Sequence, residues 1–323
     1  MSMVSFDHLK YSTKTVIAVT NMNINLELFH QNIPYLNYSF PKKKRGRKKQ
    51  DEVPEVFINK LDFFPVGSII ALQNKQDLKG ELPKKKQNDP EKKSFFRNSV
   101  SIQMKIAPSK FVNGKICSNG KFQITGCSED KYAYQFIYIL YEKMLETSSY
   151  IGEPIVTITK NSIFKSDYPT AIMNVVMKNI NFKIGFQIHR EKLDEYIRLH
   201  TPYYSLFLSD LHTCVNIKMK STHHTEEKLD MIIMKSRDEI EIEKIDYSLY
   251  STYYDYNKKL NKDKYHTFLV FYSGSVILSS SGPDTREVYN EFMRIIQENR
   301  ELFNDKTKYD EKVTLSESDM TFA

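Results

Sequence analysis

The sequence contains one local pattern twice, and this repetition limits the folds that the chain can adopt. The first copy covers residues 111–127 and the second covers residues 268–282. Each copy places a glycine-centred turn between two alternating apolar runs, which predicts a β-hairpin because glycine accepts a positive φ. A helix-like sequence follows each hairpin directly. The two turn glycines, Gly120 and Gly274, lie 154 positions apart.

A second short match favours an internal duplication. Asn23–Leu28 and Asn179–Ile184 both read Asn-Ile-Asn followed by an apolar, a charged and an apolar residue, and they lie 156 positions apart. Two matches at nearly the same offset are typical of a tandem repeat. We therefore expect two copies of one structural unit.

Each copy has the pattern of a strand, a helix, several strands that end in the hairpin, and a long helix. The strands and helices expected in the first copy cover residues 16–20, 26–33, 95–106 and 131–145, with a small extra hairpin at 64–82 and a short strand at 155–159. Those of the second copy cover residues 175–177, 189–199, 214–219 and 285–303. This order predicts an α+β fold in which helices cover one face of an antiparallel sheet and the other face stays open. Side by side, the two copies would form a pseudo-symmetric saddle, a curved antiparallel sheet with helices on its convex face and with loop and hairpin inserts.

The same pattern predicts the domain organisation. Residues 1–13 are a loose lead-in, 14–147 the first repeat, 148–170 a connector, 171–303 the second repeat, and 304–323 a flexible tail. The first repeat carries a basic insert at about 40–94 and the second an insert at about 220–264 that should hold another hairpin.

Positive charge is clustered rather than spread along the chain. The net charge is +7, and seven of the eight residues in Lys42–Lys49 are basic. Such a run cannot pack in a core and must stay solvated. Two interpretations remain open: an arm for nuclear localisation or polyphosphate binding, or a solvated loop. A second basic stretch covers residues 84–93.

Catalytic, metal and membrane functions find no support in the sequence. The three cysteines have no zinc-binding spacing, and their low odd number is typical of a reducing compartment. His223-His224 with Glu226-Glu227 lacks a third spaced metal ligand. There is no phosphate-binding loop, dinucleotide motif, carboxylate pair or apolar span. We expect a soluble intracellular protein that is not an enzyme, with no cofactor, no metal and no membrane partner.

Alternation along the strands predicts which residues line the open face. In residues 99–106 the apolar side chains point one way, and Ser99, Ser101, Gln103 and Lys105 point the other. If Phe268 and Val270 face the helices, Leu269 and Phe271 face outwards. Ile277 and Ser279 share that side on the return strand. Exposed apolar groups among small polar ones indicate a binding surface and suit the shape-led readout of the DNA minor groove.

These segments resemble the TATA-box-binding protein family, whose two repeats each end in an apolar-Phe-x-Ser-Gly-Lys hairpin followed by a helix. The second copy has Leu269–Ser275 at this place, and the first has Lys115–Lys121 followed by Ile124-Thr125-Gly126. The inserts, and the segments 95–106 and 267–274, most resemble the divergent members from giant, nucleocytoplasmic large DNA viruses. The resemblance covers residues 15–303, interrupted by inserts.

The resemblance implies a general transcription initiation factor. Its partners would be double-stranded, AT-rich promoter DNA, bound in the minor groove, and a transcription factor IIB-like protein with RNA polymerase. It would act in an infected host cell, in the nucleus or a cytoplasmic viral factory, or be packaged in the virion. Two alternatives stay open: an interaction scaffold of this fold that has lost sequence-specific DNA binding, and sequence-independent DNA compaction.

The resemblance also assigns residues. Aromatic wedges that open base steps would be Phe271 and Phe207 in the second repeat and Phe95 or Phe96 in the first. Cys117 stands where the family has its other first-repeat Phe, and a thiol offers little area for stacking, so insertion should be weaker there. The remaining DNA contacts that the resemblance implies are Leu269, Ile277, Ser279, Gln123, Thr125 and Asn174, with Thr15 as the first-repeat counterpart of Asn174, and Lys105, Lys121 and Lys218 toward phosphates.

Overall fold

The computed structural model describes residues 5–37, 64–80, 98–108, 110–209, 213–221, 228–236, 239–253, 264–282 and 284–305. It separates into two compact units. The first-repeat unit comprises residues 14–175 and 228–250, and the second-repeat unit comprises residues 1–13, 176–227 and 251–323. Lys42–Lys49, residues 84–93, Phe95, Phe96 and the His223-His224 pair lie outside the described residues.

The first-repeat unit is an antiparallel sheet with helices on one face, as the α+β pattern predicts. Its strand order is β1-β7-β6-β5-β3-β4. These strands are β1 (Tyr11–Thr20), β7 (Lys121–Cys127), β6 (Lys110–Cys117), β5 (Ser99–Ala107), β3 (Ile69–Asn74) and β4 (Asp77–Gly80). The predicted small hairpin is β3–β4, and β3 also pairs with β5, so it extends the sheet. The short strands β2 (Met22–Ile24) and β8 (Val156–Ile158) pair with each other beside α1 (Leu26–Asn32).

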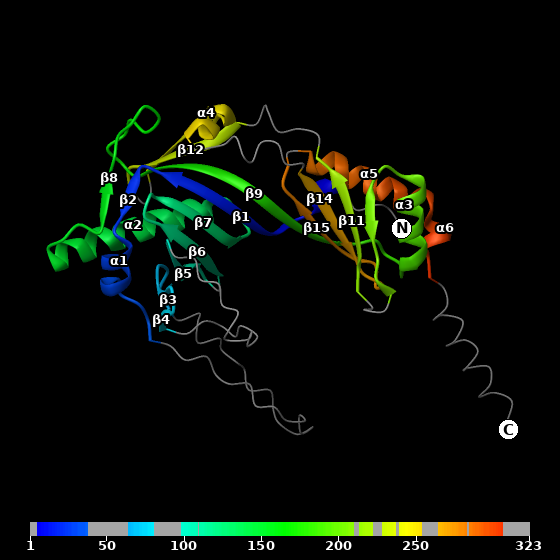
Figure 1. The fold of residues 1–323 in the computed structure, drawn as a ribbon, viewed down its shortest axis with the longest axis horizontal. Coiled ribbons are helices and arrows are strands. Elements are labelled where there is room, and N and C mark those ends of the chain that lie inside the picture. The colour runs from blue at the N-terminus through cyan, green and yellow to red at the C-terminus, as the bar shows by residue number, and fades with distance from the viewer. Residues whose placement is uncertain are drawn as a thin grey trace, which may run out of the picture. The chain divides into compact units, whose positions relative to one another are not determined.

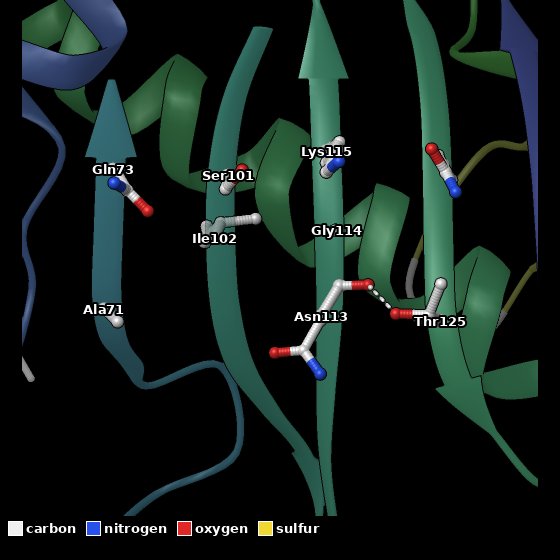
Figure 2. A pocket seen from close by; sticks show the side chains of 9 residues that line it. Ala71, Gln73, Ser101, Ile102, Asn113, Gly114, Lys115 and Thr125 are labelled. Atoms are coloured by element: carbon white, nitrogen blue, oxygen red, sulfur yellow. Dashed lines mark hydrogen bonds between the residues drawn. The ribbon is translucent and has the colours of Figure 1, made fainter. Parts of the chain in front are cut away.

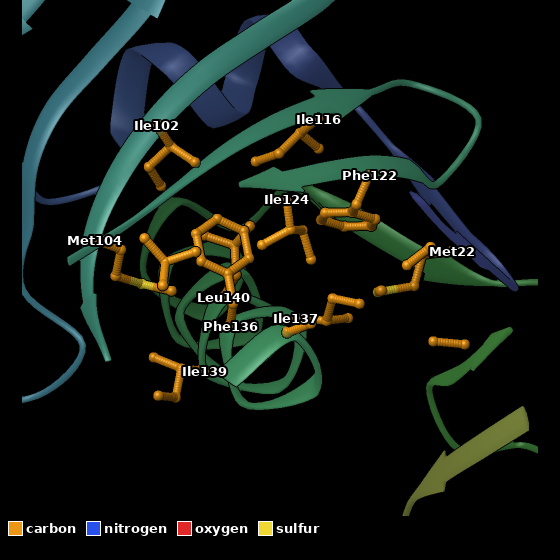
Figure 3. Close-up of a cluster of buried hydrophobic side chains, with 14 of the residues drawn as sticks. Met22, Ile102, Met104, Ile116, Phe122, Ile124, Phe136, Ile137, Ile139 and Leu140 are labelled. Atoms are coloured by element: carbon orange, nitrogen blue, oxygen red, sulfur yellow. The ribbon is translucent and has the colours of Figure 1, made fainter. Parts of the chain in front are cut away.

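Helix α2 (Lys131–Ile151) covers one face of this sheet (Figure 1). Ile102, Ile116 and Phe122 point from the strands towards its apolar stripe, which includes Phe136 and Leu140 (Figure 3). All five are at most 3% exposed. Burial of this stripe against the sheet holds the helix in place, because apolar burial contributes about 25 cal/mol per Å².

The C-terminal end of α2 differs from the prediction, whereas its start at Lys131 agrees with it. The helix runs past residue 145 into the expected connector and ends at Gly152, which has a φ of 76° and donates its N–H to the carbonyl of Ser148. Asp130 precedes the first residue of the helix and makes no side-chain capping bond. The Asp130 carboxylate instead pairs with Lys14 of β1 at 2.8 Å.

The second-repeat unit repeats this plan with strand order β10-β11-β14-β15-β9. These strands are β10 (Tyr204–Leu206), β11 (Val215–Lys220), β14 (Tyr265–Val270), β15 (Ser275–Ser280) and the second half of β9 (Thr170–Lys183). The helices α3 (Arg190–His200), α5 (Thr285–Glu298) and α6 (Arg300–Phe303) complete the unit. Phe268 stacks on Phe292 of α5 with a centroid distance of 4.2 Å, so the helices again cover one face only.

Residues 6–8 and 304, near the two ends of the described chain, contact the second-repeat unit. A short 3-10 helix, η1 (Phe6–His8), packs on α5 of the second-repeat unit through Phe6 and Tyr289, whose ring centroids are 5.5 Å apart. The lead-in is therefore part of this unit. At the other end, the expected helix at 285–303 breaks between α5 and α6, and Asn304 pairs with Ile188. Residues 306–323 of the expected tail lie outside the described residues.

Equivalent hydrogen bonds align the two copies. The N–H of Thr20 donates to Gly120 and that of Ile184 to Gly274, at 3.1 and 2.8 Å. Likewise Ile24 donates to Ser118, and Ile188 donates to Tyr272. The hairpins are thus 154 positions apart, and the strand ends and helix starts that they contact are 164 apart.

The Asn-Ile-Asn match was therefore misleading. At an offset of 164 positions, Asn23 corresponds to Gln187 and not to Asn179. Asn25 caps helix α1, whereas Asn179 and Asn181 lie inside strand β9. The hairpins still support the repeat, and the second copy has ten fewer residues between its first helix and its hairpin.

The insert of the second repeat packs in the other unit. The predicted hairpin is β12 (Lys228–Met234) and β13 (Ile240–Asp246), followed by α4 (Tyr247–Tyr253). Strand β12 pairs with Thr170–Met173 of β9, and Ile232 and Met234 join the core of the first-repeat unit.

No helix among the described residues is long and apolar enough to cross a bilayer.

Gly114 is the closest contact between the sheet and α2. A Cβ atom there would lie 2.3 Å from Cζ of Phe136 and 3.3 Å from Cγ2 of Ile102. We expect Gly114→Ala to lower the free energy of unfolding by about 1–3 kcal/mol, because overpacking forces buried side chains from their rotamers. Urea unfolding measures this. Asn113→Ala, on the exposed side of the same strand, is the control and should change stability by less than about 0.5 kcal/mol; equal effects of the two changes would contradict this packing.

Candidate nucleic-acid interface

The face of the first-repeat sheet away from α2 carries two rows of mostly polar side chains. Strand register places Gln73, Ser101, Lys115, Gln123 and Ile17 in one row. The next row contains Ala71, Gln103, Asn113, Thr125 and Thr15. Figure 2 shows Ala71 and Gln73 of β3, Ser101 of β5, and Asn113 and Lys115 of β6 in front of α2. Together with Gln123 and Thr125 of β7, these residues line a groove of about 210 Å³, which we call the polar groove.

The polar groove is rich in hydrogen-bonding groups and carries positive charge. Among the residues that line it there is one cation, Lys115, and no carboxylate. Gln103, in the second row, is 9% exposed and its Oε1 has no hydrogen-bond partner. This oxygen is buried, and Gln103 is not among the residues that line the groove. The groove suits a polar or anionic ligand.

The open face of the second-repeat unit has the corresponding rows. One contains Leu206, Asn216, Leu269, Ile277 and Asn181. The other contains Tyr204, Lys218, Thr267, Ser279 and Asn179. We call this the apolar face because Leu206, Leu269 and Ile277 lie on it.

 The predicted alternation is confirmed: Phe268 and Val270 are fully buried, and Leu269 pairs with Ile277 on the other side. Carboxylates are absent from both rows.

Cys117 and Phe271 occupy equivalent positions at the ends of the two hairpins. The turn glycine donates its N–H to the carbonyl of Cys117 in one copy and of Phe271 in the other. Phe271 is 37% exposed, so its ring is accessible. Burial raises the pKa of the Cys117 thiol, against the opposing effect of Lys121 and Lys115. A thiol with a raised pKa is protonated at neutral pH and makes a poor nucleophile.

The register corrects one assigned residue. Thr15 pairs with Thr125, and Asn179 pairs with Ser279. The counterpart of Thr15 is therefore Asn179 and not Asn174. The Oδ1 atom of Asn179 is buried without a partner, as is that of Asn216 on the same face.

Two further residues are not placed to contact a ligand on these faces. Lys105 is only 2% exposed, because the chain at Gly67 and Ser68 pairs with its backbone. Phe207 packs against the core of the second-repeat unit, and the guanidinium of Arg190 lies 4.9 Å from its ring centroid. Neither position supports the phosphate contact or the wedge that the resemblance implies.

The other assigned residues lie on the open faces or beside them. Gln123 and Thr125 line the polar groove, and Lys218 lies on the apolar face with its Nζ 5.9 Å from the Tyr204 ring centroid. Lys121 begins β7 next to the hairpin turn. Sequence reasoning missed Asn113 and Lys115, although the alternation of β6 up to Cys117 contained that signal.

Part of the first-repeat open face is covered, contrary to the prediction. Ile172 of β9 and Met231 of β12 are paired and buried on the side away from α2, since their neighbours Ala171 and Ile232 join the core. Tyr250 of α4 is 7% exposed and its side chain hydrogen-bonds to Asn174. The insert therefore covers the sheet at β9 and leaves the polar groove open.

A buried hydrogen-bond network in the second-repeat unit has the composition of a catalytic triad. Nδ1 of His266 lies 2.9 Å from Ser280 Oγ, and Nε2 lies 2.9 Å from Asp284 Oδ1. His266 and Ser280 have no exposed surface, so no substrate reaches the serine. Asp284 stands at the N-cap of α5 but makes no side-chain capping bond, and it accepts a hydrogen bond from Ser221 instead. The network joins α5 to the sheet.

Comparison with solved structures shows a likeness in fold. No family model and no curated protein matches the sequence. Among solved structures, the TBP of Methanococcus jannaschii superposes with a TM-score of 0.42 at 10% identity, covering 90% of this chain and 98% of that chain. A superposition of this quality gives no residue-level correspondence.

The buried network predicts a graded loss of stability. Asp284→Ala removes the acceptor that His266 and Ser221 share, so each buried polar group left unpaired should cost about 1–3 kcal/mol. Asp284→Asn keeps a side-chain oxygen and should lose less. Urea unfolding of both variants measures the difference. Equal stability of Asp284→Ala and the unchanged protein would contradict the structural role of the network.

Proposed function

We propose that the chain binds double-stranded DNA through the open sheet faces of its two units. The observation that carries this proposal is the repetition of the faces themselves. In each unit the helices cover one side of the sheet, and the same strand register leaves two rows of neutral and basic side chains on the other. A surface kept uncovered in both copies is best explained by a ligand that contacts both.

The chemistry of the two faces suits the minor groove. Its floor offers hydrogen-bond acceptors and apolar edges, and its walls carry phosphates. Leu269 and Ile277 supply apolar contact, Thr125 and Ser279 supply small hydroxyls, and the lysines Lys121 and Lys218 supply charge at the margins. The absence of carboxylates from the two rows of each face removes repulsion from the phosphates.

We expect Phe271 to act as a wedge. It is exposed at the end of β14, where a ring can enter between base pairs and widen the groove. Its equivalent, Cys117, lacks such a ring. We therefore expect bending mainly at the end that contacts the second-repeat unit.

The biological role that follows is recognition of AT-rich promoter DNA by a general transcription initiation factor. The bound chain would recruit a transcription factor IIB-like protein and RNA polymerase. The sequence resemblance to the viral members of the TATA-box-binding protein family supports this role and an origin in a large DNA virus.

One observation favours a second candidate, an interaction scaffold without DNA binding. The insert covers the first-repeat sheet at Asn174, where Tyr250 is buried. Together with Cys117 at a wedge position, this would fit a chain that has kept the fold and changed its ligand.

Titration of labelled duplexes at several salt concentrations tests the proposal. We expect binding to an AT-rich duplex that weakens with salt. Phe271→Ala should raise the Kd roughly 5- to 150-fold, since stacking on a base contributes about 1–3 kcal/mol. Tyr150→Ala removes a 91% exposed aromatic ring at the end of α2 and is the matched control, which should leave the Kd unchanged.

The reverse change tests the equivalence of the hairpins. Cys117→Phe should tighten binding and increase the bend, measured by energy transfer between dyes at the duplex ends. If the chain binds no duplex, or if Phe271→Ala does not alter the Kd, the result favours an interaction scaffold without DNA binding. Equal affinity for AT-rich and GC-rich duplexes favours sequence-independent DNA compaction.

A further inference from the structure

We infer that strand β13 of the insert binds an extended segment of a partner protein, in which basic and apolar residues alternate, as an added strand of the sheet. This inference does not depend on DNA binding. It rests on three properties of β13: a free edge, an apolar side that continues the core, and an acidic side.

The edge of β13 that faces away from β12 is the longest free strand edge in the described part of the chain. β13 has seven residues and pairs with β12 alone. The strands at the two ends of the sheet order, β4 and β10, have four and three residues. The register of β13 with β12 is unbroken, and residues 241–244 are exposed. A regular, exposed edge of this kind is a template for strand addition.

The backbone groups of the even-numbered residues, Ile240, Ile242 and Lys244, face this free edge. Across the turn, the N–H of Lys235 donates to the carbonyl of Glu239. Hydrogen-bonded and non-hydrogen-bonded pairs alternate along an antiparallel ladder, so the odd-numbered residues of β13 bond to β12 and the even-numbered residues point away from it. An added strand would pair with these outward N–H and carbonyl groups.

One side of β13 continues the apolar core. Ile240 and Ile242 lie opposite Met234 and Ile232, which belong to the core of the first-repeat unit. Ile240 is partly buried against that core, whereas Ile242 is 56% exposed. Apolar residues on an added strand would cover Ile242 and remove its surface from water.

The other side of β13 is acidic. Glu241 and Glu243 both lie on it and are exposed. Lys235 pairs with Glu241, and no residue of the described chain forms an ion pair with Glu243. At the free edge these two residues occupy non-hydrogen-bonded positions, where facing side chains approach most closely. A lysine or arginine of the added strand would therefore form a favourable cross-strand pair with Glu243.

The charges of β13 disfavour a second copy of this chain as the added strand. Two antiparallel copies related by a two-fold axis pair residues of the same side. The three registers that pair five or more residues place Glu243 opposite Glu243, Glu241 opposite Glu243, or Lys244 opposite Lys244. Like charges in direct opposition are destabilising, so the partner is a different, basic segment.

Binding of synthetic peptides to the full chain tests the inference. The probe is a fluorescent peptide of alternating valine and lysine that matches β13 in length. One control peptide alternates valine and glutamate, and the other has the valines and lysines of the probe in two blocks. The probe should bind, and each control should bind roughly 10-fold more weakly or not at all. Absence of probe binding, or equal binding of the three peptides, overturns the inference.

Methylation of the backbone amides of the probe separates strand addition from charge attraction. The amides of the valines and those of the lysines point to opposite edges of an extended strand. Methylation of one set should therefore abolish binding, and methylation of the other set should not. Equal binding of the two methylated peptides would contradict pairing through a strand edge.

Variants of β13 locate the site. Glu243→Lys should weaken binding of the probe and strengthen binding of the valine–glutamate peptide. Ile242→Pro removes an outward N–H, which an edge strand tolerates, and should abolish binding. Ile242→Ala keeps that N–H and should weaken binding by only roughly 2- to 10-fold. Urea unfolding checks that each variant is folded, and a peptide preference that Glu243→Lys leaves unchanged overturns the assignment to β13.

Discussion

The register between each hairpin and its entry strand determines the rest of the structure. Gly120 and Gly274 take positive φ values of 68° and 74°, and their carbonyls accept hydrogen bonds from Thr20 and Ile184. A Cβ atom on either glycine would lie 2.1 Å from a backbone oxygen, of Met22 or of Phe186. This close approach fixes which side chains of the flanking strands face the helices and which face outwards.

Stability and function are therefore carried by opposite sides of the same strands. The free energy of folding comes mainly from the helix side, where Phe136 packs on Gly114 in one copy and Phe292 on Phe268 in the other. The outward residues contribute little to that core. They were free to diverge after the duplication, which explains how one backbone plan carries a polar groove in one unit and an apolar face in the other.

Local signals in the sequence predicted much of this, and long-range pairing explains what they missed. The Gly120 and Gly274 turns, the alternation around Phe268 and the equivalence of Cys117 with Phe271 depend on neighbouring residues. Contacts between segments far apart in the sequence determine three other features. These are the position of Asn179, the packing of η1 on α5 and the packing of the β12–β13 insert. The burial of Lys105 and the hydrogen-bond network around His266 also depend on tertiary contacts. A local sequence pattern therefore could not predict them.

The central claim is that the open faces bind the minor groove of DNA. Competition with a small ligand specific for AT-rich minor grooves tests it most directly, with the chain first bound to a labelled duplex of matching sequence. We expect the ligand to displace the chain from the duplex. Methyl groups added in the major groove should leave the Kd of the chain for the duplex unchanged. Simultaneous binding of chain and ligand to one site, or sensitivity to the major-groove methyl groups alone, would contradict it.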